Sequence, residues 1–145
     1  MSNAYLECIL DDALAEEIIN RSVPVLLKDG FLFRQGEPAD NVYIVASGEV
    51  MLSLSAGENE AVKIQAAKGW LPGLPAVIGN QPYAVTAKAA PDAEVFKLGS
   101  IAFKELLDTE PRLQKAMLQI LAAQARIAVM AMVDLASDFT RNNPG

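Results

Sequence analysis

The pattern of apolar and polar positions divides the chain into a β-rich centre and helical ends. Between residues 23 and 98, short apolar stretches are separated by glycine, proline, asparagine and aspartate, at a spacing typical of an all-β sandwich or roll. The clearest strand is residues 50–55, where every second residue is valine or leucine, so one face is expected to be buried. Alternation resumes at residues 62–66 after a turn at 56–60, which predicts a hairpin. Further strands are expected at about 83–89 and 94–98.

A short helix is predicted before the β-rich region. Asp11 or Asp12 can cap a helix over residues 13–20. Leu14 and Ile18 fall on one face of this helix and are expected to pack against the domain.

Beyond residue 98 the pattern is helical. Ser100 is a suitable N-cap for a helix over residues 101–108. Pro111 is expected to begin a second helix, because proline is tolerated at the first helical position. No glycine or proline interrupts this helix before Pro144, so it is expected to continue to about residue 138.

The long C-terminal helix is apolar on two sides, each forming a seam with near-heptad spacing. One seam can pack on the β-roll, and a domain of this size offers little more surface to cover the other. A homodimer that pairs two copies of this helix is therefore predicted, and a helix folded back over its own domain is the alternative. The first seam consists of Leu118, Leu121, Ala125, Ala128, Met132, Leu135 and Phe139, and the second of Leu113, Ala116, Ile120, Ala123, Ile127 and Met130.

Composition limits the possible partners. A chain of 145 residues with 52% hydrophobic and 21% charged residues suits one soluble domain with a core. Its net charge of −6 gives no overall attraction to nucleic-acid phosphates or to an anionic membrane surface. The longest largely apolar stretch, residues 117–135, is interrupted by four polar or charged residues and is not expected to span a membrane. Neither direct nucleic-acid binding nor membrane insertion is therefore predicted.

Residue counts also limit the chemistry. The chain has no histidine, which excludes serine–histidine and cysteine–histidine catalysis and histidine-bound metals in their usual forms. No enzymatic activity, metal site or cofactor is predicted. Cys8 is the single cysteine, so no intrachain disulfide can form, and the cytoplasm is the expected location.

Residues 30–50, with glycines where tight turns are needed and apolar core positions between them, resemble the opening of a cyclic-nucleotide-binding domain of the catabolite-activator (Crp/Fnr) type. The resemblance continues through Gly69, Gly73 and residues 103–107, and covers nearly all of residues 11–138. It implies a mainly β fold with helices, namely a double-stranded β-helix (jelly roll) with a long C-terminal helix.

The resemblance also places a phosphate-binding cassette at residues 69–87, which contain no charged side chain. In the family, a short helix presents backbone N–H groups to the cyclic phosphate, an arginine neutralises it, and a glutamate binds the ribose hydroxyl. Here the glutamate position after Gly73 holds Leu74, and the arginine position after Pro82 holds Tyr83. Losing two charge-assisted contacts predicts nucleotide binding that is at least about a thousandfold weaker.

The same cassette is still expected to contain the ligand contacts. Helix N–H groups could bind an anion weakly, an apolar or neutral ligand could lie against Leu74, Ala76, Val77, Ile78 and Tyr83, or these side chains could fill the pocket themselves. Trp70 is expected to pack as a cover on the roll rather than to stack on a base. The candidate binding residues are Gly73, Leu74, Pro75, Ala76, Tyr83 and Ala84.

The predicted function is that of a regulatory or sensor module that resembles the effector domain of Crp/Fnr-type transcription regulators and does not bind cAMP in the standard way. Its partner would be an unknown small molecule or protein. The alternative is a nucleotide-binding regulatory protein whose altered cassette receives a cation from Lys88 or Arg34. A jelly-roll enzyme is disfavoured by the lack of histidine and of clustered acids. The expected organisation is a β-roll sensor domain at 1–110, a dimerisation helix at 111–139 and a tail at 140–145.

Overall fold

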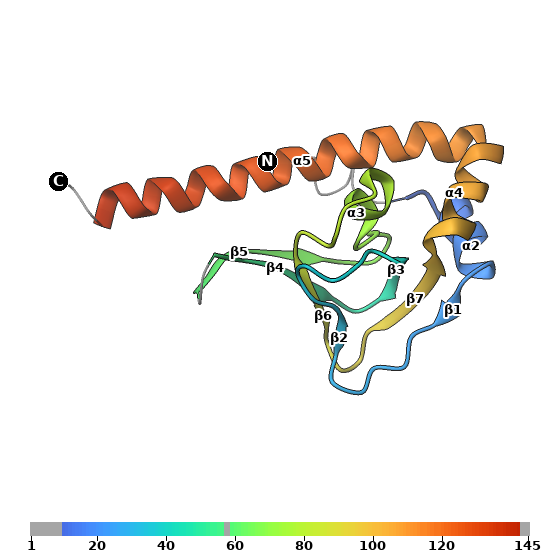
Figure 1. The fold of residues 1–145 in the computed structure, drawn as a ribbon, viewed down its shortest axis with the longest axis horizontal. Coiled ribbons are helices and arrows are strands. Elements are labelled where there is room, and N and C mark those ends of the chain that lie inside the picture. Colours follow the sequence, from blue (N-terminus) through green and yellow to red (C-terminus); the bar gives the residue numbers. More distant parts are fainter. Residues whose placement is uncertain (1–9, 57–58, 143–145) are drawn as a thin grey trace.

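The computed structural model describes residues 10–56 and 59–142, which form a β-roll with helices packed on it (Figure 1). Cys8 lies outside the described residues. In chain order the elements are α2 (Asp12–Asn20), β1 (Val23–Pro24), β2 (Phe31–Phe33), β3 (Asn41–Ser47), β4 (Val50–Ala56), β5 (Asn59–Ala66), α3 (Leu74–Gly79), β6 (Thr86–Ala89), β7 (Glu94–Gly99), α4 (Ser100–Thr109) and α5 (Pro111–Asn142).

The strands form two antiparallel sheets, ordered β1-β7-β3 and β2-β6-β4-β5. Strands far apart in the sequence are neighbours in both: β3 pairs with β7 from Asn41 opposite Gly99, and β4 pairs with β6 from Val50 opposite Ala89. This pairing wraps the chain twice around one core, as in a double-stranded β-helix. The predicted fold class, a mainly β jelly roll with a long C-terminal helix, is confirmed.

The predicted hairpin is also confirmed, with a shorter turn than expected. β4 and β5 pair from Val50 opposite Ala66 as far as Ala56 opposite Asn59. The strands therefore extend into the segment expected to be a turn, because regular pairing satisfies backbone groups that a longer loop would leave to water.

The helix before the roll is capped as predicted. Asp11 is the N-cap of α2, and its carboxylate accepts a hydrogen bond from the backbone N–H of Leu14. Leu14 and Ile18 are buried, so the apolar face of α2 packs into the domain.

The prediction that Ser100 caps the next helix is wrong. Gly99 is the N-cap of α4 and Ser100 is its first helical residue, with no side-chain cap bond. The reason is that β7 continues through Gly99, where the strand pairs with Asn41, so the helix begins directly from the strand end. α5 begins at Pro111 as predicted and continues to Asn142.

The core consists of two clusters of buried apolar side chains. The roll cluster lies inside the roll and includes Val50 and Trp70, whereas the helix cluster lies beneath α2, α4 and α5 and includes Phe103. β3 contributes to both, because Tyr43 and Val45 point into the roll while Val42 and Ile44 point to the helices. This explains why β3 is apolar at successive positions.

The second predicted seam of α5 packs on the domain. Leu113 and Ile120 belong to the helix cluster, and Ala123 and Ile127 belong to the roll cluster. Met130 is the exception in this seam, because its side chain is exposed.

Of the first seam, Leu118 and Ala125 are exposed, but the exposed face of α5 is rotated relative to the prediction. Leu121 packs partly against the helix cluster, and Val129, which the prediction left out, is exposed. The exposed apolar residues of this face are Leu118, Ala122, Ala125 and Val129, spaced four, three and four residues apart, and we call them the outer stripe. The side chains of Ala128, Met132, Leu135 and Phe139 lie outside the described part of the structure. No helix in the described ranges is long and apolar enough to cross a membrane.

Candidate functional site

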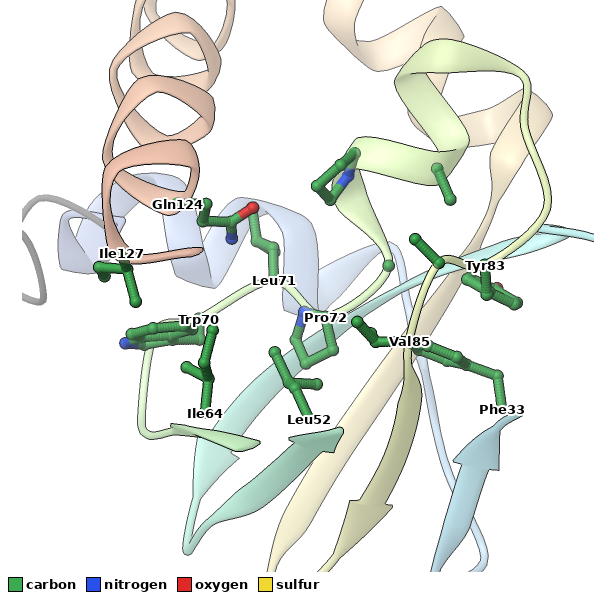
Figure 2. A pocket seen from close by; sticks show the side chains of 14 residues that line it. Phe33, Leu52, Ile64, Trp70, Leu71, Pro72, Tyr83, Val85, Gln124 and Ile127 are labelled. Atoms are coloured by element: carbon green, nitrogen blue, oxygen red, sulfur yellow. The ribbon is translucent and has the colours of Figure 1, made fainter. Parts of the chain in front are cut away.

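A cavity of about 160 Å³ lies between the roll, the α3 segment and α5. Trp70, Ile64 and Ile127 lie on one side of it, and Tyr83 and Phe33 lie on the other (Figure 2). None of its lining residues is charged. The wall consists of Phe33, Leu52, Ile64, Trp70, Leu71, Pro72, Gly73, Pro75, Ala76, Tyr83, Ala84, Val85, Gln124 and Ile127.

The cassette has the backbone that its position in the family implies. Gly73 adopts a left-handed conformation with φ of 87° immediately before α3, and Pro75 lies in the first turn of that helix. At the other end Asn80 is also left-handed, with φ of 52°, and the Lys104 ammonium donates a hydrogen bond to its side-chain oxygen. The short helix is thus present, without the charged side chains that accompany it in the family.

Tyr83 fills the position expected for the arginine. Its hydroxyl donates a hydrogen bond of 2.6 Å to the carbonyl oxygen of Asn41 and accepts one of 3.2 Å from the Asn41 N–H. Its ring stacks on Phe33 with centroids 3.7 Å apart. Burial, reinforced by the negative charges of Asp40 and Glu37, raises the pKa of Tyr83 to about 12, so the phenol is neutral at physiological pH.

A Cβ built on Gly73 would approach the Tyr83 ring within 2.9 Å. The tyrosine therefore occupies space directly beside the start of α3. We conclude that the position expected to hold a positive charge holds a neutral side chain. Its hydroxyl is bonded to the Asn41 backbone and its ring is stacked on Phe33.

Leu74, at the glutamate position, does not line the cavity. Its side chain is fully buried in the helix cluster. A leucine gains from leaving water, so it turns into the core where a carboxylate would remain hydrated. Val77 and Ile78, also expected at the pocket, pack with the same cluster.

The other candidate binding residues gather at the cavity. Gly73, Pro75, Ala76, Tyr83 and Ala84 all contribute to its wall. Trp70 is buried as predicted and also forms part of this wall.

The sequence interpretation missed the contribution of the roll, whereas the family resemblance already implies that the long helix near residues 124–129 can reach over the ligand. Leu52 and Ile64 face one another across β4 and β5, and Gln124 and Ile127 come from α5. The alternation of β4 and β5 marks Leu52 and Ile64 as inward-facing, so this signal was available. Gln124 sits beside the buried seam, but only the packing of α5 shows which edge meets the cavity.

The two cations considered for an altered cassette lie elsewhere. The Arg34 guanidinium carbon is 3.8 Å from the centre of the Phe31 ring, and the Lys88 ammonium is 4.9 Å from it. Neither residue lines the cavity. Among residues 10–56 and 59–142, no group of three or more potential metal-ligating side chains gathers into a site.

Comparison with known proteins agrees with this architecture. The cyclic nucleotide-binding domain family matches residues 25–110. Uncharacterized NTE family proteins of Mycobacterium tuberculosis and Mycobacterium bovis are 32% identical over 115 residues, which is 79% of this chain and 19% of theirs. The chain therefore spans about a fifth of the length of these curated relatives.

Two solved structures have the same fold. The N-terminal domain of a transcriptional regulator from Streptomyces coelicolor A3(2) is 25% identical, with a TM-score of 0.61 over 88% of this chain and 93% of that one. The catabolite activator protein of Thermus thermophilus is 24% identical, with a TM-score of 0.71 over 88% of this chain and 61% of that one. This chain belongs to the cyclic nucleotide-binding domain family and has the fold of catabolite-activator-type regulators.

Proposed function

We propose that this chain is a regulatory ligand-binding domain of the Crp/Fnr type whose ligand is not a cyclic nucleotide held in the standard way. One observation carries the proposal: the cavity beside the cassette has no charged lining residue, and its two anchor positions hold Leu74 and Tyr83. The protein would act as a sensor, not as an enzyme, since its wall offers no acid, base or nucleophile suited to catalysis.

The energetic argument is one of desolvation. A cyclic phosphate that leaves water must recover its hydration energy from hydrogen bonds and a counter-charge. At the start of α3, Pro75 has no N–H and the Leu74 N–H already donates to the Leu71 carbonyl oxygen. No lining residue of the cavity supplies the counter-charge. Each charge-assisted bond contributes about 1.5–3 kcal/mol, so missing two costs about 3–6 kcal/mol. A buried phosphate without a counter-charge costs more still, and together these losses predict an affinity at least about a thousandfold weaker.

Calorimetry with cAMP and with cGMP tests the proposal. We expect no saturable binding below millimolar nucleotide. A micromolar dissociation constant that is lost in a Tyr83→Ala variant would overturn it, because that result would place the nucleotide in the cassette. The Tyr43→Phe variant serves as a control, since Tyr43 points into the roll but does not line the cavity.

The second part of the proposal is dimerisation through α5. This helix has 32 residues, and its C-terminal half extends past the roll (Figure 1). The outer stripe has the four-three-four spacing of a helix-pairing seam. The matched segment covers only 19% of the curated relatives. We therefore further propose that the domain regulates an activity located elsewhere in a longer protein or in a bound partner.

A further inference from the structure

We propose that the cavity binds an uncharged, apolar molecule about the size of one aromatic ring. This inference rests on the proposed function, because it names the ligand class of the same site. It also decides between alternatives that the sequence left open, since Tyr83 fills only part of the pocket and a cavity remains with the side chains in place.

The volume sets the size of the ligand. An apolar cavity of about 150 Å³ in a protein stays dry and binds benzene, and the cavity here measures about 160 Å³. A cyclic nucleotide combines a base, a ribose and a phosphate, so it would need several times the space of one ring. The cavity therefore matches a small ring compound, whereas a cyclic nucleotide would extend beyond it.

The wall sets the polarity. Leu52, Ile64 and Ile127 present aliphatic carbon, and Phe33, Trp70 and Tyr83 present aromatic rings from opposite sides (Figure 2). The Tyr83 hydroxyl is already bonded twice to the Asn41 backbone. An ion would lose its hydration in this cavity and gain no counter-charge, whereas an apolar ring would gain by leaving water.

One side chain offers a polar contact. Gln124 reaches from α5 toward the cavity and is half-buried (Figure 2). Its amide can both donate and accept a hydrogen bond. A ring with one hydroxyl is therefore expected to bind more tightly than the bare hydrocarbon.

Three probes that share a methyl-substituted ring are titrated into the full chain: toluene, p-cresol and p-toluate. They differ in the para group, which is hydrogen, a hydroxyl or a carboxylate. The chain has one tryptophan, Trp70, so its indole N–H gives a single NMR signal from the cavity wall. We expect toluene and p-cresol to shift this signal saturably at millimolar concentrations or below, and p-toluate to leave it unchanged.

Two alanine-to-leucine variants test whether the probes bind in the cavity. Ala76 is buried at the cavity wall, whereas Ala102 is exposed on α4 and does not line it. Ala76→Leu adds three carbon atoms in the cavity and is expected to weaken toluene binding at least about tenfold. Ala102→Leu makes the same chemical change and is expected to have no effect. Thermal unfolding of both variants checks that they fold.

The Gln124→Leu variant tests the polar contact. It also tests the location of binding if Ala76→Leu does not fold. It is expected to weaken p-cresol binding roughly three- to tenfold, with no loss for toluene. Equal losses for both probes would overturn the role of Gln124.

The outcomes separate the ligand class from the regulatory role. Failure of both neutral probes to bind, or equally tight binding of p-toluate, would overturn the ligand class while leaving the absence of nucleotide binding intact. Micromolar cAMP that shifts the Trp70 signal and displaces toluene would overturn the proposed function itself.

Discussion

Tyr83 is the residue on which the site depends, because it makes two hydrogen bonds and one ring stack at the position where the family has a cation. Both bonds go to the backbone of Asn41 at the start of β3. The side chain thus joins the end of the cassette to the roll, so a substitution that changes ligand binding at this position is also expected to remove this link.

Removing this hydroxyl is expected to destabilise the fold. Tyr83→Phe removes the hydroxyl that bonds to both the N–H and the carbonyl oxygen of Asn41. This should lower the free energy of unfolding by about 1–2 kcal/mol. Tyr43→Phe removes a hydroxyl that donates a longer bond, of 3.0 Å, to the Leu32 carbonyl oxygen and that also meets the Asn41 side chain. It should cost less than losing the 2.6 Å bond of Tyr83. Urea denaturation at neutral pH measures both, and an equal or larger cost for Tyr43→Phe would contradict the double role of the Tyr83 hydroxyl.

The same hydroxyl predicts a loss of stability in alkali. Burial raises the pKa of Tyr83 from 10 to about 12, so the unfolded chain releases this proton at a lower pH than the folded one. The stabilisation is therefore fully present below pH 10 and is lost as the pH rises toward 12. Unfolding free energies measured across this window should fall less steeply for Tyr83→Phe than for the parent. Parallel curves would show that Tyr83 titrates normally.

Leu74 shows where residue identity alone misleads. Its place in the sequence correctly located it beside the cassette, but hydrophobic burial turned its side chain into the helix cluster. The position of Leu74 in the motif predicts where its backbone lies. Its apolar side chain determines that it packs in the helix cluster and does not face the cavity.

The turn between β3 and β4 shows how tightly the strands constrain the chain. Gly48 has φ of 77°, and a Cβ there would lie 2.6 Å from the Ala93 Cα. Gly36 has a similar φ of 92°, but no atom lies within 4 Å of the equivalent Cβ position. The two glycines therefore share a backbone conformation and differ in available space.

This pair gives a matched prediction. Gly36→Ala should cost only the conformational penalty of a left-handed alanine, about 1–2 kcal/mol. Gly48→Ala should cost clearly more, because backbone atoms of the neighbouring turn must also move. Thermal unfolding of the two variants provides the comparison. Equal unfolding midpoints would mean that the backbone at Ala93 moves away from the new Cβ at no measurable cost.

Most helices and strands were predicted correctly because their positions are determined by residues within or next to each element. The Asp11 cap, the β4–β5 alternation and Pro111 at the start of α5 each act over a few residues. Ser100 was misassigned because strand pairing with Asn41, a distant contact, fixed where β7 ended. The sequence located the cassette residues and marked Leu52 and Ile64 as inward-facing. It did not show that these residues share one cavity wall, because the cavity depends on contacts between distant segments.

For the molecule as a whole, the outer stripe on α5 determines the expected assembly. Leu118 is 72% exposed and Val129 is 59% exposed, although both lie in the middle of a helix that packs well on its other side. Exposed apolar residues at this spacing are stabilised when a second helix covers them.

Light scattering tests this expectation. The parent chain should have the mass of a dimer, and the double variant Ala125→Glu, Val129→Glu should have the mass of a monomer, because four carboxylates would otherwise be buried together. Gln119→Glu places a charge on an exposed position of α5 outside the stripe and should leave the dimer intact. A monomeric parent would refute the dimer, and a dimeric double variant would refute this interface.

The Tyr83–Asn41 link and the burial of Leu74 also affect what it would cost to place the family's arginine and glutamate at these two positions. Tyr83→Arg alone would lose the hydrogen bonds and the ring stack before any phosphate is present to compensate. Leu74→Glu alone would place a carboxylate in an apolar cluster. Each substitution is therefore expected to lower the stability of the fold as long as no nucleotide is bound, so a gain of nucleotide affinity would come with a loss of stability.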